Sequence, residues 1–210
     1  MSQPTLLDII NNTSGTYTGD LRYYFKIIFN APNSTLPYHN FRHTCHVLYH
    51  SHQAIMYYGD LGPQNARNLL IAAMFHDYNH TGKSDIKDSE NILFAIEGLR
   101  NHILEEDRNS LGDIIALIES TEYPHKEMDV TLSMEILRDA DQSQAFDIVW
   151  IQQIIFGLSQ EKVMSPIELL KKQIPYIQSI EMLSDWGKET FYPKKENFIN
   201  QVEKYLEILS

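Results

Sequence analysis

Apolar residues recur at three- and four-residue steps through most of this chain, a spacing typical of amphipathic helices. Strict alternation of apolar and polar residues, which would indicate strands, is scarce. The spacing predicts helices over 21–29, 40–58, 64–77, 89–103, 110–121, 128–140, 143–158, 166–187 and 194–209. We therefore expect an all-α protein, a single multi-helix domain that spans residues 1–210.

The composition narrows the class of protein further. The chain has 210 residues and a formal net charge of −11, which argues against a nucleic-acid partner. No apolar run reaches the roughly 18 residues of a membrane helix, and the N-terminus lacks the features of a signal peptide. The one cysteine, Cys45, fits a reducing environment. We expect a cytoplasmic protein with a small-molecule partner and no membrane partner.

A polar cluster, FHDYNHTG at 75–82, directly follows the apolar run NLLIAAM. An adjacent His76–Asp77 pair can direct a nitrogen and an oxygen at one cation, a donor set that suits zinc, iron, manganese or magnesium. The alternative is an ordinary helix C-terminus capped by Gly82. That alternative leaves Asp77 unexplained, because a carboxylate is unfavourable at this helix end and needs a partner when buried. The cluster therefore favours a metal site.

Two further groups of polar residues, His39 with His43 and Asp141, are interpreted differently alone and together with His76–Asp77. His39 and His43 are four residues apart in YHNFRH, so they would share one face of a helix. Taken one at a time, such histidines are best explained as surface or core residues. Asp141 ends an apolar stretch and, taken alone, fits an N-cap for a helix near Ser143. Taken together with His76–Asp77, Asp141 is better explained as a fourth metal ligand.

The flanking residues carry a resemblance to a known family. YHNFRH at 38–43 resembles the Y-H-N-x-x-H motif of the class I cyclic-nucleotide phosphodiesterases. AAMFHDYNHTG at 72–82 is similar to their A-A-x-x-H-D-x-x-H-x-G, ADQS at 140–143 to their A-D-L-S, and QIPYI at 173–177 to their Q-x-x-F-I. These motifs occur in the family's order. The chain thus resembles the HD superfamily of metal-dependent phosphohydrolases, which implies an HD-domain, phosphodiesterase-like helical bundle.

The resemblance implies two divalent metal ions. The first, zinc or iron, would be held by His43, His76, Asp77 and Asp141. The second, magnesium or manganese, would be bridged to the first by Asp77 and held otherwise largely by water.

The resemblance also implies roles around the substrate. His39 would be the general acid for the leaving oxygen, and His80 would lie beside the attacking hydroxide or the phosphate. Gln173 would bond the edge of the base and Tyr176 would stack on it. The residues expected to line the substrate are Tyr38, Gln144, Gln173 and Tyr176.

The chain departs from the family's pattern at positions around the expected ligands. Asp85 stands in place of an asparagine, His46 in place of an aspartate, and Arg138 in place of a histidine. None of these changes touches the four expected ligands. His125 has two equal interpretations, an extra ligand for a second metal or for the phosphate, or a surface histidine after a turn.

The leading hypothesis is hydrolysis of a purine 3′,5′-cyclic nucleotide to the 5′-nucleoside monophosphate. Two metals would activate the hydroxide, and His39 would supply the proton. One alternative is an HD phosphohydrolase that acts on a nucleoside monophosphate, a cyclic dinucleotide or an alarmone. Another is a nucleotide sensor without catalysis, against which the four retained ligands and His39 argue.

Overall fold

The computed structural model describes residues 4–125 and 129–209, and every regular element in these ranges is helical. This confirms the all-α prediction. The α-helices are α1 Leu6–Ile10, α2 Arg22–Phe29, α3 Phe41–Tyr58, α4 Pro63–Phe75, α5 Asp88–His102, α6 Leu111–Glu119, α7 Leu132–Gln142, α8 Ser159–Glu161, α9 Pro166–Ser179 and α10 Asp185–Leu209. Two 3-10 helices, η1 Glu105–Ser110 and η2 Ser143–Phe146, and one π-helix, η3 Ile151–Leu158, complete the described set.

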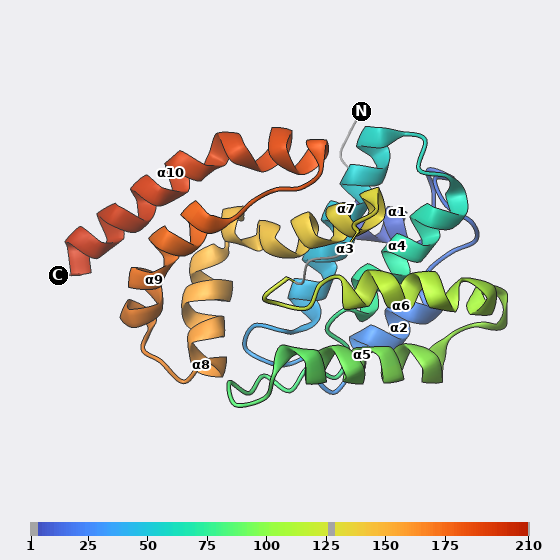
Figure 1. The fold of residues 1–210 in the computed structure, drawn as a ribbon, viewed down its shortest axis with the longest axis horizontal. Helices are drawn as coiled ribbons and strands as arrows, with labels where there is room; N and C mark the ends of the chain where they lie inside the picture. Colours follow the sequence, from blue (N-terminus) through green and yellow to red (C-terminus); the bar gives the residue numbers. More distant parts are fainter. Residues whose placement is uncertain (1–3, 126–128, 210) are drawn as a thin grey trace.

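Helices α3 and α4 form the centre of the packing. α3 packs against α4 and α7, and α4 packs in addition against α2 and α6. A second group joins η3 and α8 to α9 and α10, with α9 packed along α10, and it lies on the left in Figure 1. Helices α3, α4 and α7 therefore pack against one another. Each of them carries an expected metal ligand or leads directly into one.

Local sequence signals determine where these helices begin. The Asn40 side chain caps α3 by accepting from the backbone N–H groups of Arg42 and His43. Pro63 occupies the first turn of α4, where its missing N–H costs nothing. The side chain of Thr131 caps α7 in the same way as Asn40 caps α3. The caps of α3 and α7 fix the register of the helices that contain His43 and Asp141.

The segment 143–158 differs from the single helix predicted for it. It forms the 3-10 helix η2, then an extended residue, Asp147, and then the π-helix η3. The Asp147 carboxylate accepts the backbone N–H of Val149 at 3.1 Å, a local turn that competes with helical hydrogen bonding. The break turns η3 away from α7 and toward the loop before α3.

The C-terminal helices also differ from their predicted bounds, because of one buried carboxylate. Asp139 accepts the backbone N–H groups of Leu183 and Ser184 at 2.8 Å each, and also the Ser184 hydroxyl. These bonds hold residues 180–184 out of a helix, so α9 ends at Ser179 and α10 starts at Asp185. A single aspartate on α7 thus anchors the start of the last helix.

Arg67, on α4, is buried at 2% exposure and ties this helix to the N-terminal region. Its guanidinium donates to the backbone oxygens of Thr18 and Asp20, and to both carboxylate oxygens of Asp107 at 2.6 and 2.8 Å. Asp107 also accepts the Tyr24 hydroxyl. This network holds the helix that leads directly into His76.

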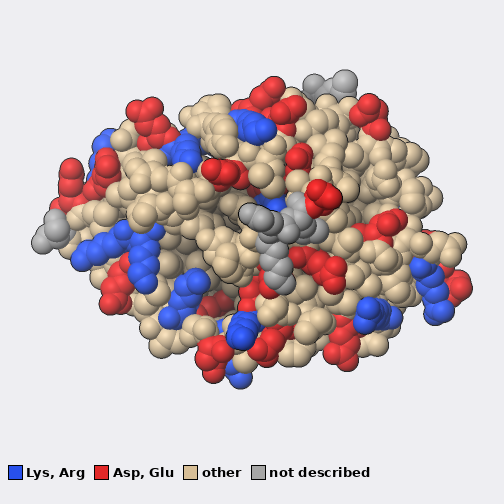
Figure 2. Space-filling model, viewed as in Figure 1, with Lys and Arg blue, Asp and Glu red and all other residues tan. Residues whose placement is uncertain are grey.

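The surface is mixed in charge. Figure 2 shows Asp and Glu spread over most of the viewed face, with Lys and Arg gathered mainly toward the side of α9 and α10. None of the helices in the described ranges is both long and apolar enough to span a membrane.

We predict that Asp107→Ala lowers the free energy of unfolding by about 3–5 kcal/mol, because it leaves the Arg67 charge buried without its main partner. Glu106 also pairs with Arg67, but its side chain is 67% exposed, so Glu106→Ala should cost at most about 1 kcal/mol. Urea denaturation of both variants measures the difference. Equal losses in the two variants would contradict this assignment.

Candidate metal centre

The four expected metal ligands meet at one point. His43 Nε2 lies 3.2 Å from Asp77 Oδ2 and 3.0 Å from Asp141 Oδ1. His76 Nε2 lies 3.2 Å from Asp77 Oδ2, 3.6 Å from Asp141 Oδ1 and 3.2 Å from His43 Nε2. His43 comes from the first turn of α3, His76 and Asp77 directly follow α4, and Asp141 lies in the last turn of α7. Asp141 is therefore inside a helix and is not an N-cap.

The far nitrogens of both histidines are fixed by acceptors. His43 Nδ1 lies 2.6 Å from Gln144 Oε1, and His76 Nδ1 lies 2.9 Å from the Ala73 carbonyl oxygen. Because both acceptors lack a proton, each Nδ1 must donate. Each Nε2 lone pair is then directed at the carboxylates, which is the arrangement of a metal-binding histidine with an orienting partner.

The carboxylates of the centre are negatively charged, and protons on the two histidines balance that charge when no metal is bound. Burial lowers the pKa of His43, but its hydrogen bonds to Asp141 and Asp77 raise it to about 9. Burial likewise opposes protonation of His76, but the charge of Asp77 and the hydrogen bond to Asp141 hold its pKa well above the usual value. Burial opposes ionisation of Asp77, and the charges of His76 and His39 nonetheless hold its pKa well below the usual range.

These residues fit a divalent cation. Ligand atoms about 2.1 Å from one ion lie roughly 3.0–3.4 Å from one another, close to the separations among His43 Nε2, His76 Nε2 and Asp77 Oδ2, which form one group within 4.8 Å. Asp141 Oδ1 approaches this group from the side of the two histidine nitrogens, at 3.0 and 3.6 Å. Asp77 Oδ2 is buried and faces His43 Nε2 and His76 Nε2 at 3.2 Å each, two nitrogens that can donate to it only when they are protonated. A buried carboxylate oxygen of this kind needs a cation or a proton. Two imidazoles with two carboxylates suit zinc, iron or manganese.

His39 lies just before the metal centre, not on the helix. Because Asn40 is the N-cap of α3, the expectation that His39 and His43 share a helix face is wrong. Instead, Asn33 holds the backbone at His39 against the loop after α4. Its Nδ2 donates to the carbonyl oxygens of His39 and Asp77 at 2.9 Å each, and its Oδ1 accepts from the backbone N–H of Asn79.

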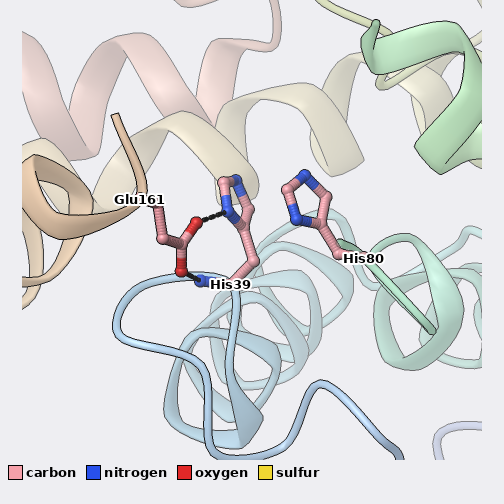
Figure 3. A group of neighbouring side chains, drawn as sticks. All are labelled: His39, His80 and Glu161. Atoms are coloured by element: carbon pink, nitrogen blue, oxygen red, sulfur yellow. Dashed lines mark hydrogen bonds and ion pairs between the residues drawn. The ribbon is translucent and has the colours of Figure 1, made fainter. Parts of the chain in front are cut away.

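Glu161, at the end of α8, is the main side-chain partner of His39. Its Oε2 lies 2.5 Å from His39 Nδ1, and its Oε1 accepts the backbone N–H groups of Tyr38 at 2.6 Å and His39 at 3.0 Å. Figure 3 shows the carboxylate on one side of the His39 ring and the His80 ring on the other. With Nδ1 bound to Glu161, Nε2 is the nitrogen of His39 that can deliver a proton.

His80 stacks on His39, with ring centroids 3.6 Å apart and planes 22° from parallel. Its Nδ1 accepts the backbone N–H of Gly82 at 3.0 Å. Burial, and then the charge of His39, lower the pKa of His80 to about 4, so the ring is neutral at pH 7 with its proton on Nε2. Gly82 has a φ of +63°, a left-handed conformation that favours glycine, and the C-cap of α4 is His76 rather than Gly82.

His39, His80 and Glu161 form a second group whose ligand atoms lie within 4.8 Å of one another. This group is less suited to a metal than the first. The two rings are stacked with planes only 22° from parallel, so lone pairs that lie in these two planes do not readily meet at one ion. His39 Nδ1 and Glu161 Oε2, at 2.5 Å, are also closer than two ligands of one ion usually lie. The geometry is that of a proton donor and its orienting carboxylate.

The expected substrate residues are brought near the metal centre to different degrees. The Tyr38 ring lies 5.1 Å from the His43 ring, and burial and then the charge of Asp141 raise the pKa of Tyr38. Burial, and then the charge of Asp141, also raise the pKa of Tyr176. Gln173 is buried one turn earlier on α9, and its Nε2 lies 3.4 Å from the Leu169 carbonyl oxygen.

Gln144 lies behind the metal centre. It is 1% exposed, and its amide oxygen is bound to His43 Nδ1. The expectation that it contacts substrate stays a prediction, whereas its contact with a metal ligand was not anticipated. Asn33 and Glu161 were also missed, because no motif or periodicity marks them. Their importance is visible only in the folded structure, where Asn33 contacts Asp77 and Glu161 contacts His39, residues distant in sequence.

His125 does not join the four ligands in the described structure. Its Nε2 lies 2.9 Å from Gln142 Nε2, and its Nδ1 lies 3.2 Å from the Glu122 carbonyl oxygen. Burial lowers its pKa. The hydrogen bonds favour the interpretation of a histidine fixed after a turn, and a role toward a second metal stays a prediction.

Two of the departures from the family pattern form structural contacts. His46 lies between Asp147, with Nδ1 at 3.0 Å, and the Ser143 hydroxyl, with Nε2 at 2.8 Å. Arg138 donates to the Ser120 carbonyl oxygen at 2.6 Å. His46 thus holds the segment that carries Gln144 against α3.

Comparison with known proteins adds no family assignment. No protein-family model matches this chain, and no curated protein matches its sequence.

We predict that Gln144→Met weakens Zn²⁺ binding by about 10–100-fold, because His43 Nδ1 loses the acceptor that orients the ring. Gln64→Met is the matched control, since the Gln64 amide donates to Asn68 and Ser110, away from the proposed ligands. Competition with a chelating dye measures both affinities. Equal affinities in the two variants would show that Gln144 does not orient the ligand.

We also predict that the apparent Zn²⁺ affinity rises as the pH increases from about 6.5 to 9. A raised histidine pKa means that His43, with a pKa of about 9, holds a proton at pH 7 that the cation must displace. That proton stabilises the metal-free protein below about pH 6.5 and is lost as the pH passes through 9. Calorimetry in buffers of different ionisation enthalpy measures proton release. Binding without proton release at pH 7 would contradict the prediction.

Proposed function

We propose that this protein is a metal-dependent phosphodiesterase that hydrolyses a purine 3′,5′-cyclic nucleotide to the 5′-nucleoside monophosphate. The observation that carries the proposal is the meeting of two His Nε2 atoms and two carboxylates beside an independent His39–Glu161 pair. A metal centre alone is common to many proteins. A positioned proton donor next to it favours a reaction in which an alkoxide leaves.

Different residues would bind the metal ions and donate the proton during hydrolysis. His43, His76, Asp77 and Asp141 would hold the first divalent cation, and Asp77 would face a second. Cations bound there neutralise the phosphate and lower the pKa of a water that attacks phosphorus. As the bond from phosphorus to the 3′ oxygen breaks, His39 Nε2 gives its proton to that oxygen.

The surroundings of His39 support the role of general acid. Glu161 binds its Nδ1 and fixes the ring, in the way that a carboxylate orients a catalytic histidine. The neutral His80 ring stacks against it and limits its rotation. A diester cleaves only if its leaving oxygen is protonated or otherwise stabilised, so this geometry favours a diester substrate.

The aromatic residues beside Asp141 support a nucleotide as substrate. The Tyr38 ring lies 5.1 Å from the ring of His43, and Tyr176 would supply a second ring, since base rings stack well on tyrosine. Gln173, one turn before Tyr176 on α9, would bond the edge of the base. A carboxamide offers both a donor and an acceptor, so it accommodates adenine as well as guanine.

The single cysteine, Cys45, is consistent with a cytoplasmic location, which we include in the proposal.

The test is a hydrolysis assay with Mn²⁺ on cAMP, cGMP, a cyclic dinucleotide, AMP and an alarmone. Wild-type protein should cleave a cyclic mononucleotide. Asp77→Asn should abolish turnover together with metal binding. His39→Asn should lower kcat by about 10²–10⁴-fold and leave metal binding intact, because it removes only the proton donor.

His102→Asn provides the matched histidine control, since His102 contacts the Tyr78 hydroxyl at the end of α5 and should leave kcat unchanged. Activity on AMP, the dinucleotide or the alarmone alone would move the protein to another HD phosphohydrolase reaction. Binding of a nucleotide without turnover would indicate a sensor, and both outcomes would contradict the proposal.

A further inference from the structure

The π-helix η3 touches the loop before α3 at one residue without a side chain. A Cβ atom on Gly157 would lie 2.4 Å from the Pro37 carbonyl oxygen, 3.1 Å from its carbonyl carbon and 3.5 Å from the Tyr38 Cα. Atoms in ordinary contact are about 3.5–4.0 Å apart. Any side chain at this position would therefore push the two backbones apart by roughly 1 Å.

The loop cannot simply retreat from such a contact, because side chains hold it in place. Asn40 Nδ2 donates to the Pro37 carbonyl oxygen at 3.2 Å and to the Leu36 carbonyl oxygen at 2.8 Å. Asn33 Nδ2 holds the His39 carbonyl oxygen. Asn40 is also the N-cap of α3, so moving the loop would disturb the helix that carries His43. The strain of a larger residue would fall mainly on η3.

Glu161 follows Gly157 by four residues, at the end of the short helix α8 that continues η3. The glutamate is 7% exposed, and its carboxylate makes all three contacts described above with Tyr38 and His39. Gly157 and Glu161 therefore contact the same loop at neighbouring residues, Gly157 at Pro37 and Glu161 at Tyr38 and His39. The closeness of the backbones at Gly157 determines how far the Glu161 carboxylate reaches. A π-helix turn at this location is typical of functional sites.

We propose that Gly157 is a positioning residue for the proton donor: its missing side chain lets η3 approach Pro37 closely enough for Glu161 to bind His39 Nδ1. The kinetic part of this inference rests on the proposed function. Gly157 acts through Glu161, and its contact with Tyr38, a residue expected to line the substrate, is with the Tyr38 backbone.

The kinetic test compares Gly157→Ala with Gly112→Ala. A Cβ at Gly112 meets no atom within 4 Å, so this variant is a matched control and should keep wild-type kinetics. Gly157→Ala should lower kcat by about 10–100-fold, since a misplacement of about 1 Å carries a cost of that order. Zn²⁺ affinity should change by less than about twofold, because the four proposed ligands lie on or directly after α3, α4 and α7 and not on η3. Wild-type kcat in Gly157→Ala would overturn the proposal.

A double-variant cycle shows whether Gly157 acts through Glu161. Once Glu161→Gln has removed the carboxylate, adding Gly157→Ala should lower kcat by less than about twofold more. An equal loss in both backgrounds would overturn the proposal. If Gly157→Ala fails to fold, Glu161→Asp serves in its place, because it withdraws the carboxylate by about 1.5 Å without a clash. Wild-type behaviour of Glu161→Asp would overturn the proposal as well.

A spectroscopic test does not depend on catalysis. The proton shared between His39 Nδ1 and Glu161 should give a far-downfield ¹H NMR signal, assigned by its loss in His39→Asn. The signal should persist in Gly112→Ala, disappear in Glu161→Gln, and shift upfield or disappear in folded Gly157→Ala. Such a change without turnover of any nucleotide by the wild type would support the inference while refuting the proposed function. An unchanged signal in Gly157→Ala would overturn the inference.

Discussion

Four atoms with lone pairs, two imidazole nitrogens and two carboxylate oxygens, meet in a largely buried space between α3, α4 and α7. Without positive charge among them, their repulsion and desolvation would oppose the packing of these helices. Protons supply that charge in the metal-free protein, and a divalent cation supplies it in the proposed enzyme. The arrangement of the central helices therefore depends on what this cluster binds.

The proposed proton donor, His39, is held by a different part of the chain from the proposed metal ligands. His39 lies on a loop that Asn33 ties to the turn after α4, while Glu161 reaches it from the end of α8. The C-terminal helices thus do more than cover the core. They bring a carboxylate to the loop, and the close contact at Gly157 sets the reach of that carboxylate. Metal binding and proton delivery can therefore be disturbed separately, which makes the two roles experimentally distinguishable.

The sequence predicted the elements whose signals are local. Helical spacing placed α2, α3, α5 and α6 to within about two residues, and His43 lies beside Asp77 and Asp141. The break at Asp147 and the start of α10 at Asp185 were not predicted, because side-chain contacts with backbone N–H groups determine them. Glu161 and Asn33 have no signature along the chain, since each acts on residues distant in sequence. The phosphodiesterase resemblance remains a prediction.

The most direct test of the central claim is anomalous diffraction from crystals of the protein grown with Mn²⁺. We expect a strong anomalous peak within bonding distance of His43 Nε2, His76 Nε2, Asp77 and Asp141, and the loss of that peak in Asp77→Asn. A protein that binds no cation there, or that binds it only between His39, His80 and Glu161, would contradict the account.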